Sequence, residues 1–475
     1  MRIPNRMALP SVLLAESMRA ITAQERAPRR APGAAARNPR RALALCVALT
    51  GIALHGLGAS ALAAPGGGAA HRAGSATGAR GAGAGARSVY PSSVSRPFSR
   101  PRRSPFTARS AAKQKAKKPR KPVLHGNPAR ALRAFEAMQR FYYIQGSGLY
   151  EGEPFSYLWP FSQGLAATVS MANVPGLPVS FTPELRARLI GLRNYLDVNN
   201  SGAPEGTYTS TLAAFDGTVA PPAGPGGAKY YDDNDWIGIE LARIYKKTRN
   251  AGALGYAEGI MAFEMAGFST DQSLACPGGI PFSNGAENTD RNTITTGPAA
   301  ELAMQLYRIT GNAQYLQFAE NAYNWVRACL LQGNGLYADH IRPHGVVDAT
   351  FWSYNQGVMI GAGTLLYQGT GNAGYLYQAR QTAQAARAYF TPQRLGEENP
   401  FFPSIYFRNI LYLDSVTHDP PGPKLAQAYV DYAWQHLRLS DDLFVAGSPA
   451  SAQLLYQAAI VQIYALLASS PSTYF

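Results

Sequence analysis

One helix ending occurs three times along the chain at nearly equal spacing. It reads Tyr245-Lys-Lys-Thr-Arg-Asn250, then Tyr307-Arg-Ile-Thr-Gly-Asn312, then Tyr367-Gln-Gly-Thr-Gly-Asn372, so the copies lie 62 and 60 residues apart. A Thr followed by Gly-Asn is typical of a helix that stops in a left-handed cap, and another helical pattern follows each copy. A period of this length indicates a repeated pair of helices joined by a tight turn.

Helical periodicity extends over most of the chain from about residue 126. Apolar residues recur at helical spacing in twelve segments, whereas no alternating pattern of useful length indicates a β-strand. The segments are 129–143, 159–171, 183–196, 232–248, 252–267, 296–310, 313–331, 354–369, 373–390, 403–415, 424–438 and 449–468. Twelve helices in six hairpins can close into a ring whose inner helices are parallel. We therefore predict an all-α fold, an (α/α)6 toroid, over residues 126–475.

If the repeats align, the residues that open the inner helices meet at one mouth of the barrel. Three such openings offer Asp232-Asp233, Asp290-Arg291-Asn292 and Trp352-Ser-Tyr-Asn-Gln356. Together they suit a sugar site, because acids perform the chemistry, amides bind hydroxyls and aromatic rings stack on pyranose faces. The alternative for Asn292, Asn355 and Gln356 is helix capping.

Asp232 and Asp233 follow a Gly/Pro-rich loop and open a predicted helix. They are expected to lie near unpaired backbone N–H groups at the positive end of the helix dipole. Two carboxyl groups this close cannot both ionise freely, so the pKa of one should rise. A carboxylate beside a protonated carboxyl is the pair that retaining glycoside hydrolysis requires. The simpler alternative is one helix cap and one solvated acid.

The net charge of +15 comes from the N-terminal quarter of the chain. Residues 1–125 hold 23 of the 44 Lys and Arg but only two acids, which leaves residues 126–475 net acidic. A nucleic-acid enzyme with a basic cleft would show the opposite distribution, so we expect no nucleic-acid partner.

The N-terminal region carries the pattern of an export signal. Arg40-Arg41 precedes an apolar run, and Ala61-Leu-Ala63 follows it, which predicts a long signal region over 1–63 with the signal at about 38–63. The protein is then secreted or held at the cell surface. The run is short for a membrane span, and an uncleaved anchor is the alternative.

Residues 64–125 consist mainly of Gly, Ala, Ser, Pro, Arg and Lys and contain no acid. This composition predicts a disordered basic linker, because it offers too little apolar surface to offset the entropy of ordering. The linker could contact an anionic cell wall or act only as a solvated tether. Cys46 falls in the signal region, so Cys276 and Cys329 remain, either as one disulfide or as two buried thiols.

Taken together, three stretches resemble glycoside hydrolase family 76, the endo-α-1,6-mannanase family. They are Tyr231-Asp-Asp-Asn-Asp-Trp236, then Cys276-Pro-Gly-Gly-Ile280 with the segment from Asn292 to Gly311, and Trp352-Ser-Tyr-Asn-Gln-Gly-Val-Met-Ile-Gly361. Their order and spacing agree with the family over about residues 128–475. Ile237, Pro281 and Thr296 depart from its usual residues at positions that we expect to shape sugar subsites.

The resemblance implies an (α/α)6 barrel and retaining hydrolysis of α-1,6-linked mannose without a metal. We expect the protein to act as a monomer that needs no other cofactor. Asp232 would be the nucleophile and Asp233 the general acid/base. Arg408 matches an arginine that the family keeps near its site, although a helix-surface role is the alternative, and Trp159 and Trp352 are either stacking platforms or core. The predicted substrate-binding residues are Tyr231, Asn234, Trp236, Asp290, Asn292, Tyr354, Asn355, Gln356, Arg408 and Trp159.

Other functions fit the sequence less well. His340 and His344, beside Asp339, have a spacing that could ligate a metal, but Pro343 and Gly345 mark a loop and no further ligand cluster accompanies them. A non-catalytic glycan-binding protein on the same barrel would tolerate loss of the acids, which are both present. Transglycosylation of an α-mannoside is a further alternative. An epimerase or an unsaturated-glycuronide hydrolase would need a His pair or a separated acid at the mouth, and the sequence indicates neither there.

Overall fold

A computed structural model of the chain describes residues 124–198, 212–418, 421–446 and 451–475. The predicted signal region, and all of the predicted linker except its last two residues, lie outside these ranges. None of the helices in the described ranges has the length and apolar character needed to cross a membrane.

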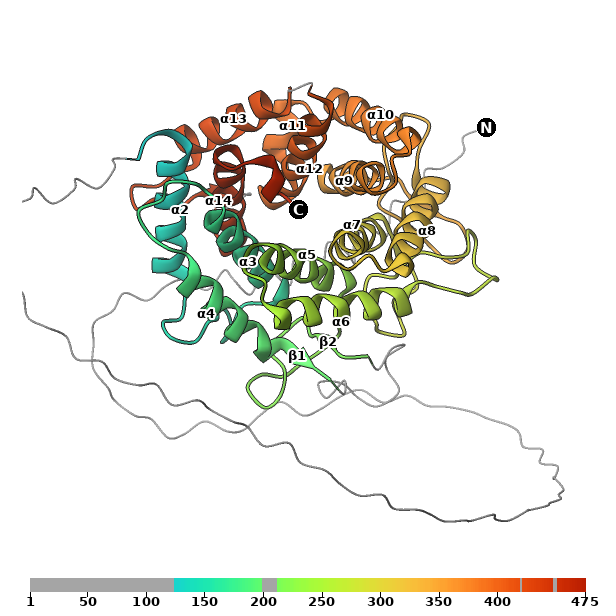
Figure 1. Ribbon diagram of the computed structural model, residues 1–475, viewed down its shortest axis with the longest axis horizontal. Helices are drawn as coiled ribbons and strands as arrows, with labels where there is room; N and C mark the ends of the chain where they lie inside the picture. The colour runs from blue at the N-terminus through green and yellow to red at the C-terminus, as the bar shows by residue number, and fades with distance from the viewer. Residues whose placement is uncertain (1–123, 199–211, 419–420, 447–450) are drawn as a thin grey trace, which may run out of the picture. The chain divides into compact units, whose positions relative to one another are not determined.

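Thirteen α-helices occur in the described residues, and twelve of them form two concentric layers (Figure 1). The inner helices are α3 (Leu158–Ala172), α5 (Tyr231–Thr248), α7 (Thr293–Thr310), α9 (Ser353–Thr370), α12 (Phe401–Thr417) and α14 (Leu454–Ala468). The outer helices are α2 (Gly126–Tyr142), α4 (Thr182–Leu192), α6 (Ala251–Gly267), α8 (Ala313–Leu330), α10 (Ala373–Tyr389) and α13 (Gly422–Tyr432). The short α11 (Pro392–Glu397) lies between α10 and α12.

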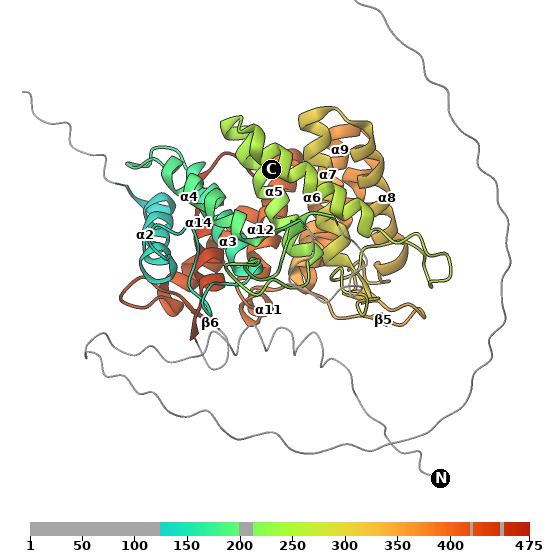
Figure 2. The same ribbon diagram turned by 90° about the horizontal axis from the view of Figure 1, so that it is seen from below.

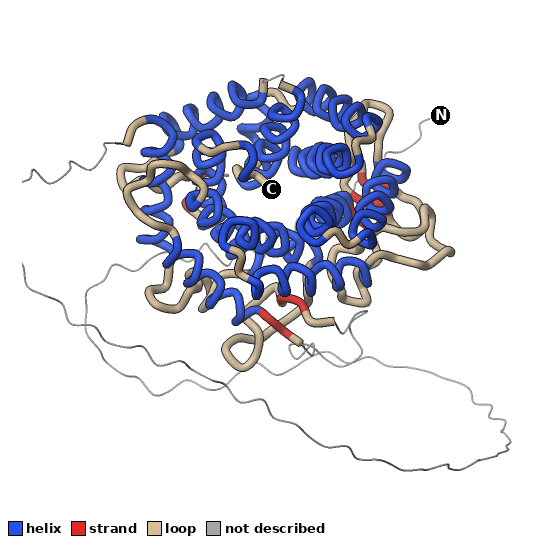
Figure 3. Tube along the Cα trace, viewed as in Figure 1, coloured by secondary structure: helices blue, strands red, loops and turns tan. Residues whose placement is uncertain are grey.

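The inner helices form a closed ring (Figure 3). Each one contacts its two neighbours in the order α3, α5, α7, α9, α12 and α14, and α14 contacts α3 again. The sixth pair joins distant parts of the chain, because α14 packs on α2, the first described helix. The prediction of an (α/α)6 toroid is therefore confirmed.

The three repeated helix ends share one hydrogen-bonding pattern. Each Thr hydroxyl donates to the carbonyl four residues earlier and accepts the backbone N–H of the Asn two residues later. The Asn side chain then caps the next helix. The residue between them is left-handed, as predicted for Gly311 and Gly371, with φ values of 75° and 74°. Arg249 takes the same conformation in the first copy, with φ of 58°.

A second repeat lies at the other end of the inner helices. The fourth residue of each of four inner helices anchors the loop that precedes it, accepting a backbone N–H from that loop. The pairs are Asn234 with Phe215, Thr296 with Ile280, Gln356 with Tyr337 and Gln457 with Phe444. Asn234 and Gln356 also donate to the carbonyl of the same loop residue. These bonds shape the loops that surround the mouth.

Replacing one of these anchors should reduce stability. In Asn234→Ala, the buried N–H and C=O of Phe215 would lose their partner, and we expect the free energy of unfolding to fall by about 3 kcal/mol. Urea denaturation of the full chain measures this, with Asn321→Ala on the exposed face of α8 as the control. Equal midpoints for the two variants would contradict the anchoring role.

The strands are short and lie in the loops before the inner helices. In the described ranges they pair as β1 (Leu196–Asp197) with β2 (Ala214–Phe215), β3 (Arg291–Asn292) with β4 (His340–Ile341), β4 with β5 (Val347–Asp348), and β6 (Val445–Ala446) with β7 (Ser451–Ala452). All pairs are antiparallel. Cys276 and Cys329 form a disulfide, with Cα atoms 6.1 Å apart, which ties the loop before α7 to α8.

Several predicted helix boundaries were wrong. Helix α7 begins at Thr293 rather than 296, because Thr293 and Thr295 hydroxyls donate to Ala338 and Ile280 carbonyls and hold an extra turn. Helix α14 begins at Leu454 rather than 449, because β7 precedes it. Helix α4 gives way to a 3-10 turn at Arg193–Tyr195, and a π-helical turn at Ala433–Leu437 follows α13.

The last residues of the chain fill the end of the barrel opposite the mouth. In Figure 2 the C-terminus lies away from the edge that carries α11, β5 and β6, whose loops lead into inner helices. The Phe475 ring packs on Tyr412, with ring centroids 4.8 Å apart, and lies 5.0 Å from the Arg408 guanidinium. Arg243 donates to the carbonyl of Thr473. The C-terminal residues therefore cover the end of the barrel where the inner helices finish.

Candidate active site

Asp232 and Asp233 lie in the first turn of α5, which begins at Tyr231. The side chains are almost fully buried, with 9% and 8% of each residue exposed. The loop before them is fixed from both sides, because Asn234 binds the backbone of Phe215 and Lys229 pairs with Asn284 through its backbone. The carboxyl groups are therefore held at the mouth rather than spread on the protein surface.

The two carboxyl groups differ in their surroundings. Burial raises the pKa of Asp232 to about 7, while the backbone N–H groups of Asp233 and Asp232 lower it and the charge of Asp339 raises it. Burial and then the charge of Asp232 raise the pKa of Asp233 well above its usual range, with no such hydrogen bonds to offset them. Asp232 is therefore the easier of the two to ionise.

Asp339 and His340 connect the loop before α7 with the loop before α9 and the first turn of α9. The Asp339 carboxylate accepts hydrogen bonds from Asn355 Nδ2 and lies 3.1 Å from His340 Nδ1, while Nε2 of His340 lies 3.4 Å from Asp290. Strand β4 brings His340 opposite Asn292 in register. Burial lowers the pKa of His340, but the hydrogen bond that His340 donates to Asp339 and the charges of Asp339 and Asp290 raise it more, so the pKa rises overall.

Asn292 and Asn355 each retain an unpaired oxygen at the mouth. Asn292 stands at the N-cap position of α7, yet its side chain makes no capping hydrogen bond. The Oδ1 atoms of both residues are buried and reached by no donor from the described residues. Two acceptors in this state suit the hydroxyl groups of a polar ligand.

Aromatic side chains cover two sides of the mouth. The half-buried Trp159 lies 6.1 Å from Trp236 and 5.9 Å from Phe401, measured between ring centroids. Tyr354 packs against Phe402 at 4.1 Å. Trp352 is also half buried beside Phe402. These rings could stack on a sugar, and Trp159 exposes the most surface of the first group.

Four of the predicted substrate-binding residues are occupied by internal contacts. Tyr231 is buried with its ring stacked on Phe263 at 4.4 Å. Asn234 and Gln356 bind loop backbone, as described above. Arg408 is buried two turns inside α12, where Nη1 donates to Glu240 at 2.9 Å and Nη2 lies 4.0 Å from Glu301. The structure therefore groups Asp290, Asn292, Tyr354 and Asn355 at the mouth, but not Arg408.

Three polar residues at the mouth were not predicted as site residues. Asp339 and His340 were considered only as metal ligands. In the structure Asp339 forms hydrogen bonds with His340 and Asn355, and His340 lies 3.4 Å from Asp290. Glu398 accepts the backbone N–H of Ser353 at the start of α9, and burial raises its pKa to about 7. Their position before an inner helix was the signal available in the sequence. In the described ranges, no three His, Cys, Asp or Glu residues are grouped to hold a metal.

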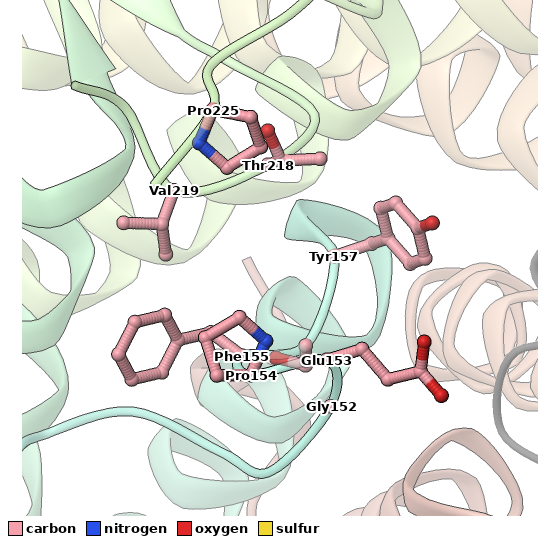
Figure 4. Close-up of a pocket in the computed structure, with 9 residues that line it drawn as sticks. Gly152, Glu153, Pro154, Phe155, Tyr157, Thr218, Val219 and Pro225 are labelled. Atoms are coloured by element: carbon pink, nitrogen blue, oxygen red, sulfur yellow. The ribbon is translucent and has the colours of Figure 1, made fainter. Parts of the chain in front are cut away.

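A pocket lies between the loops that lead into α3 and α5 (Figure 4). Its walls are largely apolar, with Phe155 and Pro154 facing Val219 and Pro225, and the Glu153 carboxylate extends away from the Phe155 ring. The Thr218 hydroxyl in its wall is already engaged, because it donates to the Gly226 carbonyl. We therefore assign the pocket no ligand.

Buried acids should make the protein less stable as pH rises. Burial is the main cause that raises the pKa of Asp216, Asp232 and Glu398 to about 7 and that of Glu301 to about 8. These groups bind protons more tightly in the folded state, so their stabilising contribution is complete below about pH 4 and is lost as pH rises to about 8. We expect the Tm to be higher at pH 5 than at pH 8.5.

Calorimetry at constant ionic strength measures this dependence. The variant Asp216→Asn should flatten the slope because it removes one of the contributing groups. A Tm that stays constant or increases from pH 5 to pH 8.5 would show that these carboxyl groups are not held protonated.

Comparison with known proteins gives a family for this arrangement. Residues 131–410 match the profile of glycosyl hydrolase family 76. Two curated relatives are named mannan endo-1,6-alpha-mannosidase DCW1. The one from Candida glabrata is 29% identical over 134 residues, or 26% of this chain and 30% of the relative. The one from Saccharomyces cerevisiae is 27% identical over 125 residues, or 24% and 28%. The matched part thus spans less than a third of these relatives.

Solved structures share the fold over a larger part of the chain. Bt3792, a family 76 mannosidase from Bacteroides thetaiotaomicron, is similar with a TM-score of 0.63 and 21% identity, covering 72% of this chain and 98% of that one. An inactive variant of the α-1,6-mannanase GH76A from Salegentibacter sp., in which two consecutive aspartates are replaced, was solved with α-1,6-mannotetrose. It has a TM-score of 0.59 and 21% identity, covering 72% and 99%. From the match over residues 131–410, the chain belongs to glycosyl hydrolase family 76.

Proposed function

We propose that the protein is a retaining glycoside hydrolase that cleaves α-1,6-mannosidic linkages, with Asp232 as the nucleophile and Asp233 as the general acid/base. The observation that carries this proposal is the pair of adjacent, almost fully buried carboxyl groups in the first turn of α5. Because their surroundings differ, one can be ionised while the other keeps a proton, as this chemistry requires.

The surroundings also support the order of the roles. Asp232 receives backbone hydrogen bonds that favour its carboxylate, so it can attack the anomeric carbon. Asp233 holds its proton more tightly and can give it to the departing glycosidic oxygen. The ionised Asp233 then removes a proton from water, whose oxygen displaces Asp232 from the mannosyl ester. The products leave and both carboxyl groups regain their first state.

Groups around the pair would hold the sugar. The unpaired oxygens of Asn292 and Asn355 can accept hydrogen bonds from mannose hydroxyls, and Trp159 or Tyr354 can stack on a pyranose face. We include Trp236 and Asp290 in this set. For Tyr231, Asn234, Gln356 and Arg408 we propose an indirect contribution through the packing that shapes the mouth.

The substrate class follows from relatives. The curated relatives are named for endo-1,6-α-mannosidase action on mannan, and one solved structure with this fold holds α-1,6-mannotetrose. We also propose that residues 1–63 direct export, that residues 64–125 link the barrel to an anionic cell-wall polymer, and that the barrel acts outside the cell as a monomer. The export and linker proposals rest on the sequence of the first 125 residues.

Incubation of the full chain with α-1,6-mannan tests the activity. We expect oligomannosides, and proton NMR of the first product should show the α-anomer, which indicates retention. Parallel reactions with α-1,2- and α-1,3-linked mannans test the linkage. Binding without release would favour a glycan-binding protein, and products longer than an added oligomannoside would indicate transglycosylation. If the chain neither binds nor cleaves any of these α-mannans, the mannan assignment is wrong.

A further inference from the structure

On the neighbouring helices α5 and α6, three carboxyl groups have buried oxygens that no donor from the described residues reaches. These are Oδ1 of Asp232, both carboxyl oxygens of Asp235 and both of Glu264, counted against the described residues. Asp235 and Glu264 are 0% exposed. An unpaired buried acceptor is costly, and most such groups in folded proteins are paired. Where acceptors adjoin only other acceptors, carboxyl groups can pair with one another if some of them carry protons.

The positions of the three residues allow this pairing. Asp235 follows Asp232 by three residues on α5, a spacing that places side chains on one helix face with Cβ atoms about 5–6 Å apart. Glu264 lies on α6, which packs on α5. Its neighbour Phe263 stacks on Tyr231, the residue before Asp232. The cluster therefore extends from the proposed nucleophile to the outer helix layer.

The charges around Asp235 favour its neutral form. Burial, then the charges of Asp232 and Glu301, raise the pKa of Asp235 well above its usual range, and burial with Asp235 and Asp232 does the same for Glu264. Arg408 binds Glu240 and approaches Glu301 instead. Helix α3, which also packs on α5, contains no ionisable residue. The other ionisable groups that interact with Asp232 are Asp233, Asp339 and Tyr354.

We propose that Asp235 is a positioning residue that, as a neutral carboxylic acid, donates its O–H to Oδ1 of Asp232 and orients that carboxylate for attack, while Glu264 donates to Asp235. This inference rests on the proposed role of Asp232. A hydrogen bond to the ionised carboxylate favours it and offsets part of the cost of its burial. A carboxylic acid kept neutral by its apolar site can serve as such a donor, whereas an ionised Asp235 would repel Asp232.

Two variants of the full chain separate these states. Asp235→Asn keeps a neutral donor of the same shape, so the acidic limb of the pH profile of kcat/KM on α-1,6-mannotetraose should stay where it is in the parent. Asp235→Leu has a similar volume and no donor, so the limb should move to higher pH by about one unit. Glu264→Gln is the matched control and should behave as Asp235→Asn does.

A shift of the limb to lower pH in Asp235→Asn would overturn the proposal, because it would mean that a negative charge had been removed beside Asp232. If the Leu variant does not fold, the Asn variant still decides. Difference infrared spectroscopy at pH 7 gives a readout that does not need turnover. The Asn substitution should remove one protonated-carboxyl C=O band, and an unchanged band with loss of a carboxylate band instead would contradict the neutral acid. If the parent chain has no activity on mannan, the proposed function is wrong. The infrared measurement would still test whether Asp235 is a neutral acid.

Discussion

Asp232→Asn and Asp233→Asn should each reduce kcat on α-1,6-mannan by roughly 10³-fold or more. Each substitution keeps the shape of the side chain but removes its ability to attack or to transfer a proton, and positioned general acids alone contribute about 10²–10⁴-fold. Both variants should be at least as stable as the parent at pH 8, because an ionised carboxyl in a buried site is costly. A fall in activity with an equal or higher Tm therefore separates catalysis from folding.

Rescue by azide distinguishes the two roles. In Asp232→Gly, azide can enter the vacated space and attack an aryl α-mannoside directly, which gives the β-mannosyl azide. In Asp233→Gly, Asp232 still forms the ester, and azide then displaces it to give the α-mannosyl azide. The opposite pair of products would exchange the proposed roles. Full activity in either Asn variant would show that the replaced aspartate takes no part in the reaction.

Loss of the disulfide should produce the largest change in stability. Cys276 and Cys329 are separated by 53 positions, and the chain-entropy relation for a loop of this length gives roughly 4 kcal/mol. The double variant Cys276→Ser, Cys329→Ser should therefore lower the Tm by roughly 5–10 °C. Cys46→Ser is the control, since it removes a cysteine outside the described residues. Equal Tm values for the double variant and the control would contradict a stabilising disulfide.

The effect should also extend to the mouth. Arg291 and Trp325 both donate to the Cys276 carbonyl, and Gly279 is left-handed, with φ of 78°, beneath the Trp325 ring. A Cβ at Gly279 would lie 2.4 Å from that ring, so any larger residue would clash with Trp325 and this position requires glycine. This loop leads to Asp290 and Asn292. We therefore expect KM for mannotetraose to rise in the double variant even below its Tm.

The helical repeat could be predicted because its signals are local. Periodic apolar residues and the Thr-Gly-Asn ending act within one or two turns, so they indicated six helix pairs and the cap at Gly311. The extra first turn of α7 could not be predicted, because hydroxyl groups of Thr293 and Thr295 stabilise it through bonds to distant loops. Helix α11 is six residues long, which is too short to show a period.

The sequence predicted where the site residues lie along the inner helices, but not which groups their side chains contact. Counting along the repeat correctly placed Asp232 and Tyr354 at inner-helix starts. Whether a polar side chain at such a start binds ligand or backbone depends on loops that are far away in sequence. Asn234 and Asn355 illustrate this, because the first is saturated by Phe215 and Tyr230 while the second keeps one free oxygen. Arg408 lies near Glu240 of α5 and Glu301 of α7, and the sequence of its own helix does not indicate these partners.

The pairing of α2 with α14 has a consequence for biosynthesis. The contact between Gln457 and the Ala134 carbonyl spans 323 positions, so the ring cannot close until nearly the whole chain has left the ribosome. Until then Phe135 and Met138 of α2 lack the helix that buries them. Contacts this distant in sequence slow folding, and exposed apolar surface invites aggregation. The nascent barrel should therefore depend on a chaperone, and truncations that end before residue 454 should accumulate as insoluble protein.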